Sequence, residues 1–266
     1  RKFIVDLGLL NKRALVLGAS GGLGRGIAEQ LVAEGAQVAL CGRKGNAMRM
    51  QAIDLESRTG CMARGYEVDL SKATAVAKLI MEVKRDFNAI DIVINNGGGP
   101  PPGPIAGADL EIIEKQFRPI VISQLEIANA FLPGMRERGW GRILIISSSG
   151  VIQPIPGLGI SNTLRSSLLG WAKTLATEVA SDGVTVNAII PGRIHTDRVN
   201  SIDANAAKNQ GVTVEEIVER SHATIPAGRY GSVAEFSKVA AFLVSDCASY
   251  ITGGSVRVDG GYIRSI

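Results

Sequence analysis

The stretch Gly18-Ala19-Ser20-Gly21-Gly22-Leu23-Gly24 decides the fold of this chain. The apolar run Arg13–Gly18 before it predicts a buried strand, and after it Leu23, Ile27 and Leu31 recur at helical spacing. A tight turn between a strand and a helix needs residues without a Cβ, and glycine also lets a phosphate approach the amides at the helix N-terminus. This order of elements predicts dinucleotide binding through Gly18, Ser20, Gly21, Gly22, Leu23 and Gly24.

Short apolar runs alternate with amphipathic segments along the rest of the chain, which predicts parallel strands covered on both faces. The further expected strands are Gln37–Gly42, Arg64–Val68, Ile90–Asn95, Arg142–Ser148, Val184–Ile190 and Ser255–Val258. The expected helices are Gly22–Glu34, Lys44–Thr59, Ser71–Phe87, Arg118–Arg138, Gly159–Ser181 and Ser232–Val244. The fold class is therefore α/β, a single doubly wound Rossmann domain over residues 1–266. Its seven-stranded parallel sheet carries helices on both faces.

The segment Ile194–Gly231 has no clear strand and predicts two short helices inserted before the last strand. An insertion at the carboxyl edge of a doubly wound sheet lies where ligands bind. We therefore expect residues 194–231 to cover the substrate.

The end of the second expected strand reads Leu40-Cys41-Gly42-Arg43-Lys44. A carboxylate at this position would bind the ribose 2′-hydroxyl of NAD, whereas a nearby arginine accommodates the 2′-phosphate of NADP. No acid is present, and Arg43 and Lys44 follow Gly42 directly. The sequence therefore favours NADP(H) over NAD(H), although the two cations can also be read as the solvated start of a helix.

Composition excludes several other classes of protein. The net charge is +4 and no long run of like charges occurs, so nucleic-acid binding is not expected. The cysteines Cys41, Cys61 and Cys247 form no metal-binding or disulfide spacing, which predicts free thiols and no metal site. No apolar stretch approaches 18 residues, and the opening Arg1–Ile4 shows no secretory pattern. We expect a cytoplasmic protein without a membrane segment.

These motifs resemble the short-chain dehydrogenase/reductase family along nearly the whole chain, in particular its 3-oxoacyl-carrier-protein reductase-like members. The further matching positions are Asp69 with Leu70 beside the adenine, Asn95-Asn96-Gly97 beside the cofactor, Pro191, Gly192, Ile194 and Thr196 beside the nicotinamide, and the closing Asp259-Gly260-Gly261. The resemblance implies an oxidoreductase acting on a small-molecule carbonyl or alcohol. It also implies a homo-oligomer, a dimer or tetramer, formed through the two long helices.

The active site departs from the family pattern. The family joins a serine to a Tyr-x-x-x-Lys pair thirteen residues further on. Ser148 stands at the serine position, but Ser161 and Arg165 stand where the tyrosine and lysine are expected. The family's relay asparagine falls near Pro119–Ile120. Arg165 cannot lend a proton near neutral pH, but its cation can hold ribose hydroxyls or stabilise an alkoxide.

Three functions stay open on these residues. The first is an NADP(H)-dependent oxidoreductase in which Ser148, Ser161 and Arg165 polarise the carbonyl. The second is a catalytically impaired dinucleotide-binding protein that acts as a sensor or subunit. The third keeps the fold but catalyses elimination or isomerisation without net redox change. His195, three residues after Gly192, is either a proton source or a loop histidine with backbone partners.

Overall fold

The computed structural model describes residues 5–266. The expectation about a secretory signal concerns Arg1–Ile4, and these residues lie outside the described part of the chain. Seven strands form one sheet in the order β3-β2-β1-β4-β5-β6-β7, and all neighbouring strands are parallel. The strands are β1 Arg13–Leu17, β2 Gln37–Gly42, β3 Ala63–Glu67, β4 Ile92–Asn95, β5 Gly141–Ile146, β6 Val184–Pro191 and β7 Ser255–Val258. This sheet confirms the fold class predicted from the sequence.

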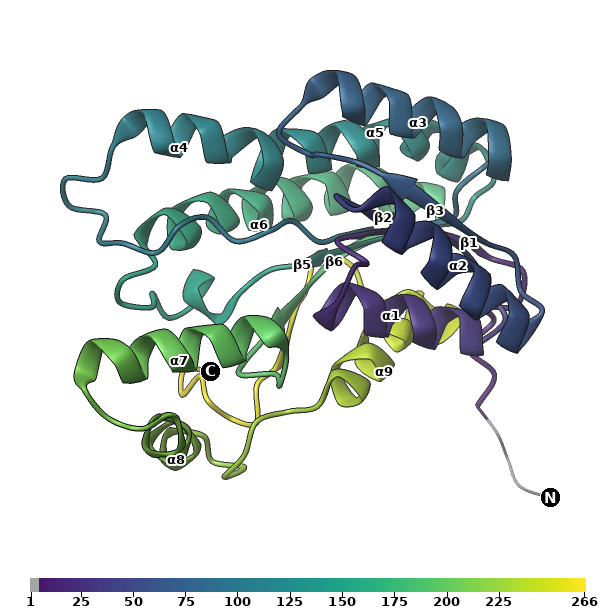
Figure 1. The fold of residues 1–266 in the computed structure, drawn as a ribbon. Coiled ribbons are helices and arrows are strands. Elements are labelled where there is room, and N and C mark those ends of the chain that lie inside the picture. The colour runs from purple at the N-terminus through teal and green to yellow at the C-terminus, as the bar shows by residue number, and fades with distance from the viewer. Residues whose placement is uncertain (1–4) are drawn as a thin grey trace.

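Helices cover both faces of the sheet (Figure 1). They are α1 Gly22–Ala33, α2 Gly45–Thr59, α3 Ala73–Phe87, α4 Leu110–Phe117, α5 Ser123–Glu137, α6 Gly159–Val179, α7 Asp197–Gln210, α8 Val214–Thr224 and α9 Val233–Leu243. One buried apolar cluster packs α3, α5 and α6 on the sheet, and a second packs α1, α2 and α9 on the opposite face. No helix within residues 5–266 is both long and apolar enough to span a membrane.

The helix expected over 118–138 is the largest correction. The structure begins a helix earlier, at α4, where Asp109 caps it by accepting the amide of Glu111 at 2.9 Å. A π-helical turn over Arg118–Ile122 then joins α4 to α5. Pro119 lies in this turn and has no N–H to donate, so the regular ladder of hydrogen bonds cannot run through it. The sequence pattern showed the apolar face of α5 but not the helix that precedes it.

Strand β1 is the point where the winding of the sheet reverses. It pairs with β2 on one side and with β4 on the other, so the loops after β1 and β4 leave the same edge side by side. In open sheets of this kind, ligands bind in the crevice at such a reversal. The glycine loop after β1 lies at this crevice.

The insertion between β6 and α9 contains α7 and α8, the two helices expected there. Its two ends are joined by a bridge between Ile194 and Gly231. The buried carboxylate of Asp203 in α7 ties the segment down, because it forms an ion pair with Arg193 and accepts the hydroxyl of Tyr230 at 2.9 Å. Figure 1 shows α7 and α8 standing apart from the helices that cover the sheet.

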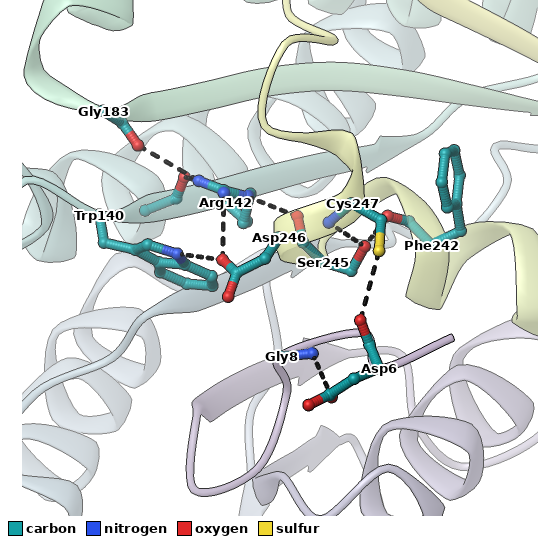
Figure 2. Close-up of polar contacts among 10 residues, drawn as sticks. Asp6, Gly8, Trp140, Arg142, Gly183, Phe242, Ser245, Asp246 and Cys247 are labelled. Carbon is teal, nitrogen blue, oxygen red and sulfur yellow. Dashed lines mark hydrogen bonds and ion pairs between the residues drawn. The ribbon is translucent and has the colours of Figure 1, made fainter. Parts of the chain in front are cut away.

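The amino edge of the sheet holds a buried cation. Arg142 of β5 is 2% exposed and donates to the carbonyl of Ser245 at 3.2 Å (Figure 2). The Trp140 ring lies between two cations, with Lys12 Nζ 3.8 Å and Arg142 Cζ 4.2 Å from its centroid. Asp246 accepts the indole N–H of Trp140 at 2.7 Å. Arg142 is therefore held by carbonyls, an aromatic face and one nearby carboxylate.

The segment before β1 closes over this cluster. The carbonyl of Leu7 accepts the amide of Asp246 at 3.0 Å, and the carbonyl of Asp6 accepts the Cys247 thiol at 3.4 Å, as Figure 2 shows for Cys247. Residues close to the two ends of the chain are thus joined at the edge opposite the glycine loop.

Candidate active site

The glycine loop has the shape that a phosphate-binding turn requires. Gly18 and Gly22 have φ of 62° and 53°, in the left-handed region that favours glycine. A Cβ on Gly24 would lie 2.4 Å from the Gly18 carbonyl oxygen and 2.8 Å from Asn96 Nδ2, whereas a Cβ on Gly21 would meet nothing within 4 Å. Helix α1 has no side-chain cap, so its first amides lack a side-chain acceptor. These features fit a dinucleotide diphosphate.

The end of β2 has the charge predicted for a 2′-phosphate. Gly42 packs closely enough that a Cβ there would lie 2.9 Å from Met48 Sδ and 3.6 Å from Ser20 Cβ. Arg43 and Lys44 follow as exposed side chains, and neither forms an ion pair within residues 5–266. Both cations remain available to an anionic ligand beside the glycine loop.

The turn after β3 lies at the same edge. Asp69 accepts the hydroxyl and the amide of Ser71 at 2.7 and 3.0 Å, and these hydrogen bonds hold the pKa of Asp69 below its usual value. The neighbouring Leu70 is half-buried, and its carbonyl accepts the hydroxyl of Ser123 at 2.6 Å. The position of Asp69 agrees with its expected place, and its contact with adenine stays a prediction.

The loop after β4 is held by buried amides. Asn96 Nδ2 donates to the Gly18 carbonyl at 3.5 Å and so links the two loops of the crevice. Asn95 is fully buried and donates instead to the carbonyl of Gln124 at 3.4 Å. The Gln124 side chain is also fully buried, and a Cβ on Gly97 would lie 2.5 Å from its Nε2. Sequence patterns do not indicate Gln124, because its role depends on packing between α5 and β4.

Arg165 is buried in α6 and binds backbone carbonyls. Its guanidinium donates to Ile146 at 3.1 Å, Gly97 at 3.2 Å and Gly98 at 3.3 Å. Burial, followed by the charge of Arg198, lowers the pKa of Arg165 to about 10, which leaves it charged at neutral pH. Arg165 therefore joins the loop after β4 to the end of β5, a role that the sequence did not indicate.

Two serines lie close to this arginine. Ser148 follows β5, and its hydroxyl accepts the amide of Gly150 at 3.2 Å. The turn that carries it packs against the start of α6, since a Cβ on Gly150 would lie 2.2 Å from Asn162 Oδ1. Ser161 precedes Asn162 and is half-buried, one helical turn before Arg165. The structure thus brings the three expected catalytic positions to one region.

The residues at the end of β6 and just after it lie at the same edge of the sheet as the glycine loop. Gly192 allows close approach of the last loop, because a Cβ there would lie 2.6 Å from Asp259 Cα; Pro191 precedes it as the last residue of β6. Ile194 is buried. Thr196 caps α7 and also reaches the glycine loop, where a Cβ on Gly22 would lie 3.4 Å from its Cγ2.

His195 lies beside Thr196 at the mouth of a cavity between α1, the start of α7 and α9. Its side chain is exposed and its backbone amide donates to the Gly231 carbonyl at 2.8 Å. Within residues 5–266, no group of three or more histidine, cysteine or acidic side chains is arranged to hold a metal ion.

Comparisons with known proteins agree with this geometry. The sequence profile described as "Enoyl-(Acyl carrier protein) reductase" matches residues 18–263. The 3-oxoacyl-[acyl-carrier-protein] reductase of Aquifex aeolicus is 32% identical over 257 residues, which cover 97% of this chain and 99% of that protein. A putative ketoacyl reductase of Streptomyces coelicolor is 31% identical over 252 residues, covering 93% and 95%.

Solved structures give the same result. The structure of L-sorbose reductase from Gluconobacter frateurii, complexed with NADPH and L-sorbose, superposes with a TM-score of 0.93 at 30% identity, covering 98% of this chain and all of that chain. An actinorhodin polyketide ketoreductase with NADPH superposes with a TM-score of 0.88 at 30% identity, covering 95% and 97%. The sheet, the glycine loop and these full-length matches lead to one conclusion: this chain belongs to the short-chain dehydrogenase/reductase family.

Proposed function

We propose that this protein is an NADP(H)-dependent oxidoreductase that reduces a small-molecule carbonyl, or oxidises the alcohol in reverse, with an altered active site. The observation that carries the proposal is the glycine cradle at Gly18–Gly24, where a side chain at Gly24 would collide with backbone and the space at Gly21 is open. The two superposed reductase structures are complexes with NADPH, which supports the same cofactor here.

The preference for the phosphorylated cofactor rests on charge. Arg43 and Lys44 lie exposed beside the glycine loop, and β2 ends in Gly42 rather than an acid. A guanidinium binds a phosphate through paired hydrogen bonds, and an ammonium adds a point charge. The diphosphate would bind at the glycine loop, to Ser20, Gly21, Gly22, Leu23 and Gly24. The rest of the cofactor site would be lined by residues from the loops after β3, β4 and β6: Asp69, Leu70, Asn95, Asn96, Gly97, Pro191, Gly192, Ile194 and Thr196.

When bound, the nicotinamide cofactor supplies the hydride. Ser148 and Ser161 then offer hydroxyl groups that can donate to the substrate oxygen, and Arg165 supplies positive charge close to both. Preorganised donors of this kind stabilise negative charge that develops on an oxygen. The α7–α8 segment, residues 194–231, would cover the substrate.

Ser161 stands at the position of the family's proton-donating tyrosine, so the proton has to come from another group. Tyr66 donates to Asp86 at 2.7 Å and Tyr230 donates to Asp203 at 2.9 Å, so both phenols already have carboxylate partners. Tyr250 is fully exposed. We therefore propose that water or a group of the substrate donates the proton. Because a positioned general acid contributes about 10²- to 10⁴-fold, turnover should be slow.

The test is NADPH oxidation by the purified protein over a panel of ketones, aldehydes and 3-oxoacyl thioesters. We expect slow turnover, lost in Ser148→Ala, and a gain of tenfold or more when Ser161→Tyr is combined with Arg165→Lys. Tight NADPH binding without consumption of any carbonyl would instead support a dinucleotide-binding sensor or subunit. Conversion of a substrate with unchanged NADPH absorbance would reject hydride transfer.

The sensor reading has one observation in its favour. Arg165 donates hydrogen bonds to three backbone carbonyls. These bonds use N–H groups that a catalytic arginine would direct to the cofactor or substrate. The paired substitution Ser161→Tyr and Arg165→Lys tests the surroundings of the site, because an intact pocket should gain reductase activity and an unsuitable one should not.

A further inference from the structure

Two chain segments beside the proposed catalytic residues contain no charged side chain. Residues 92–108, which form β4 and the loop after it, contain no charged side chain, and neither do residues 143–164 between β5 and α6. Arg165 and Arg198 place their guanidinium groups against the first of these uncharged segments, at Gly97 and Gly99. Their surroundings decide what kind of group the pocket can accept.

Arg165 is a buried cation without a counter-ion. It is 8% exposed, all its hydrogen bonds go to uncharged carbonyls, and no carboxylate within residues 5–266 forms an ion pair with it. Burying an ion that lacks an opposite charge costs several kcal/mol. The charge of Arg198 adds repulsion and contributes to lowering the pKa of Arg165.

Arg198 is the second residue of α7, and its side chain reaches the loop after β4. A Cβ on Gly99 would lie 3.2 Å from Arg198 Nη2 and 3.7 Å from its Cζ, so the absence of a side chain at Gly99 gives the guanidinium room. Arg198 is exposed and forms no ion pair within the described chain. Arg165 binds the carbonyls of Gly97 and Gly98, so one three-glycine segment contacts both guanidinium groups.

Resting on the proposed reductase function, we propose that Arg198 is a specificity residue that binds an anionic oxygen group of the substrate, in the simplest case a carboxylate. Arg165 supplies the second positive charge of the same site. A planar guanidinium can donate two parallel hydrogen bonds to a carboxylate, and no carboxylate within residues 5–266 competes for Arg198. The anion would relieve the repulsion between the two cations.

The cofactor phosphates are the other anions that Arg198 could bind, and the fold places the proposed cofactor diphosphate site apart from Arg198. The proposed diphosphate site lies at the glycine loop, where a Cβ on Gly22 would lie 3.4 Å from Thr196 Cγ2. Arg198 is two residues further along and lies against Gly99, in the loop that leads from β4 towards α4. We therefore assign its partner to the substrate, and the test includes the cofactor as the opposing outcome.

The test compares an oxo acid with its neutral ester, for example 3-oxobutanoate with methyl 3-oxobutanoate. The native protein should favour the acid in kcat/KM by about tenfold or more. Arg198→Gln should lower this acid-to-ester ratio at least tenfold, and Arg198→Lys should restore part of it. The matched control is Arg58→Gln on α2, an exposed arginine paired with Asp54 outside the segment proposed to cover the substrate, which should leave the ratio unchanged. An equal ratio in native protein and Arg198→Gln overturns the proposal.

A binding measurement keeps this inference separate from the reductase proposal. Calorimetry on the protein saturated with NADPH should detect butanoate but not butanamide, and Arg198→Gln should weaken butanoate at least tenfold. If butanoate binds in this way while no carbonyl is reduced, the proposed reaction fails and the anion site stands. If Arg198→Gln weakens NADPH itself and leaves the preference for butanoate over butanamide unchanged, the anion belongs to the cofactor and the inference is wrong.

Discussion

Adding one methyl group at Gly21 should weaken cofactor binding strongly without disturbing the fold. Gly21 has φ of 179°, an extended conformation open to any residue, and a Cβ there would meet no heavy atom within 4 Å. We therefore expect Gly21→Ala to change the free energy of unfolding by less than about 0.5 kcal/mol. The methyl would occupy the space of the proposed diphosphate. Loss of one charge-assisted hydrogen bond costs about 1.5–3 kcal/mol, which weakens NADPH roughly 10- to 100-fold.

Gly24→Ala should behave differently. Its Cβ would lie 2.4 Å from the Gly18 carbonyl oxygen, which is backbone and cannot rotate away. Overpacking of this kind costs about 1–3 kcal/mol. For a chain of this size, about 2 kcal/mol corresponds to a fall in Tm of roughly 4–8 °C. Both variants should bind NADPH weakly, but only Gly24→Ala should melt early.

The assay is a fluorescence titration with NADPH together with a thermal melt of each variant. Gly170→Ala is the control, because Gly170 lies in α6 and a Cβ there meets nothing within 4 Å. It should keep the native Kd and a Tm that is equal or higher, since alanine favours helix over glycine. Native NADPH affinity in Gly21→Ala would refute the proposed diphosphate site.

Three further predictions concern cofactor choice, pH and the insertion. Replacing both Arg43 and Lys44 by serine should raise the Kd for NADPH about tenfold and leave that for NADH unchanged; an equal effect on both cofactors would contradict the 2′-phosphate assignment. Asp91 is buried, which raises its pKa, but hydrogen bonds and charge from Arg13 outweigh this and lower the pKa below its usual value. The pair therefore stabilises the fold above pH of about 4 and loses this effect as the pH falls through the lowered pKa, so Asp91→Asn should cost about 1–3 kcal/mol at neutral pH and progressively less in acid; a pH-independent difference in unfolding free energy would reject this. Tyr230→Phe removes the 2.9 Å hydrogen bond to a buried carboxylate of α7 and should speed amide exchange in that helix; native exchange rates there would show that the bond does not hold the insertion.

The sequence predicted the fold well because the sheet depends on local signals. Runs such as Gln37–Gly42 and Ser255–Val258 are apolar, short and bounded by turn residues, and the structure forms strands over the same residues. The capping box of Ser232 and Glu235 also opens α9 as expected. The π turn at Arg118–Ile122 was missed because a proline inside an amphipathic pattern indicates a helix boundary but not how the chain passes it.

The site was predictable only where a residue's role follows from its neighbours in the chain. The glycine loop and the cations after β2 are of this kind. The contacts of Arg165 with Gly97 and Gly98 join residues 67 and 68 positions apart. The approach of Arg198 to Gly99 likewise depends on how α7 folds over the crevice. Neither spacing nor composition contains such information, because it arises when the sheet brings loop ends together.

The layer around Trp140 and Arg142 has a consequence for the order of folding. Strand β1 is made early and sits at the centre of the sheet, yet the carbonyls of Asp6 and Leu7 find their partners only at Cys247 and Asp246. These partners follow Trp140 and Arg142 by about a hundred residues in the chain, so the indole and guanidinium lack them from the time they are synthesised until Asp246 and Cys247 follow.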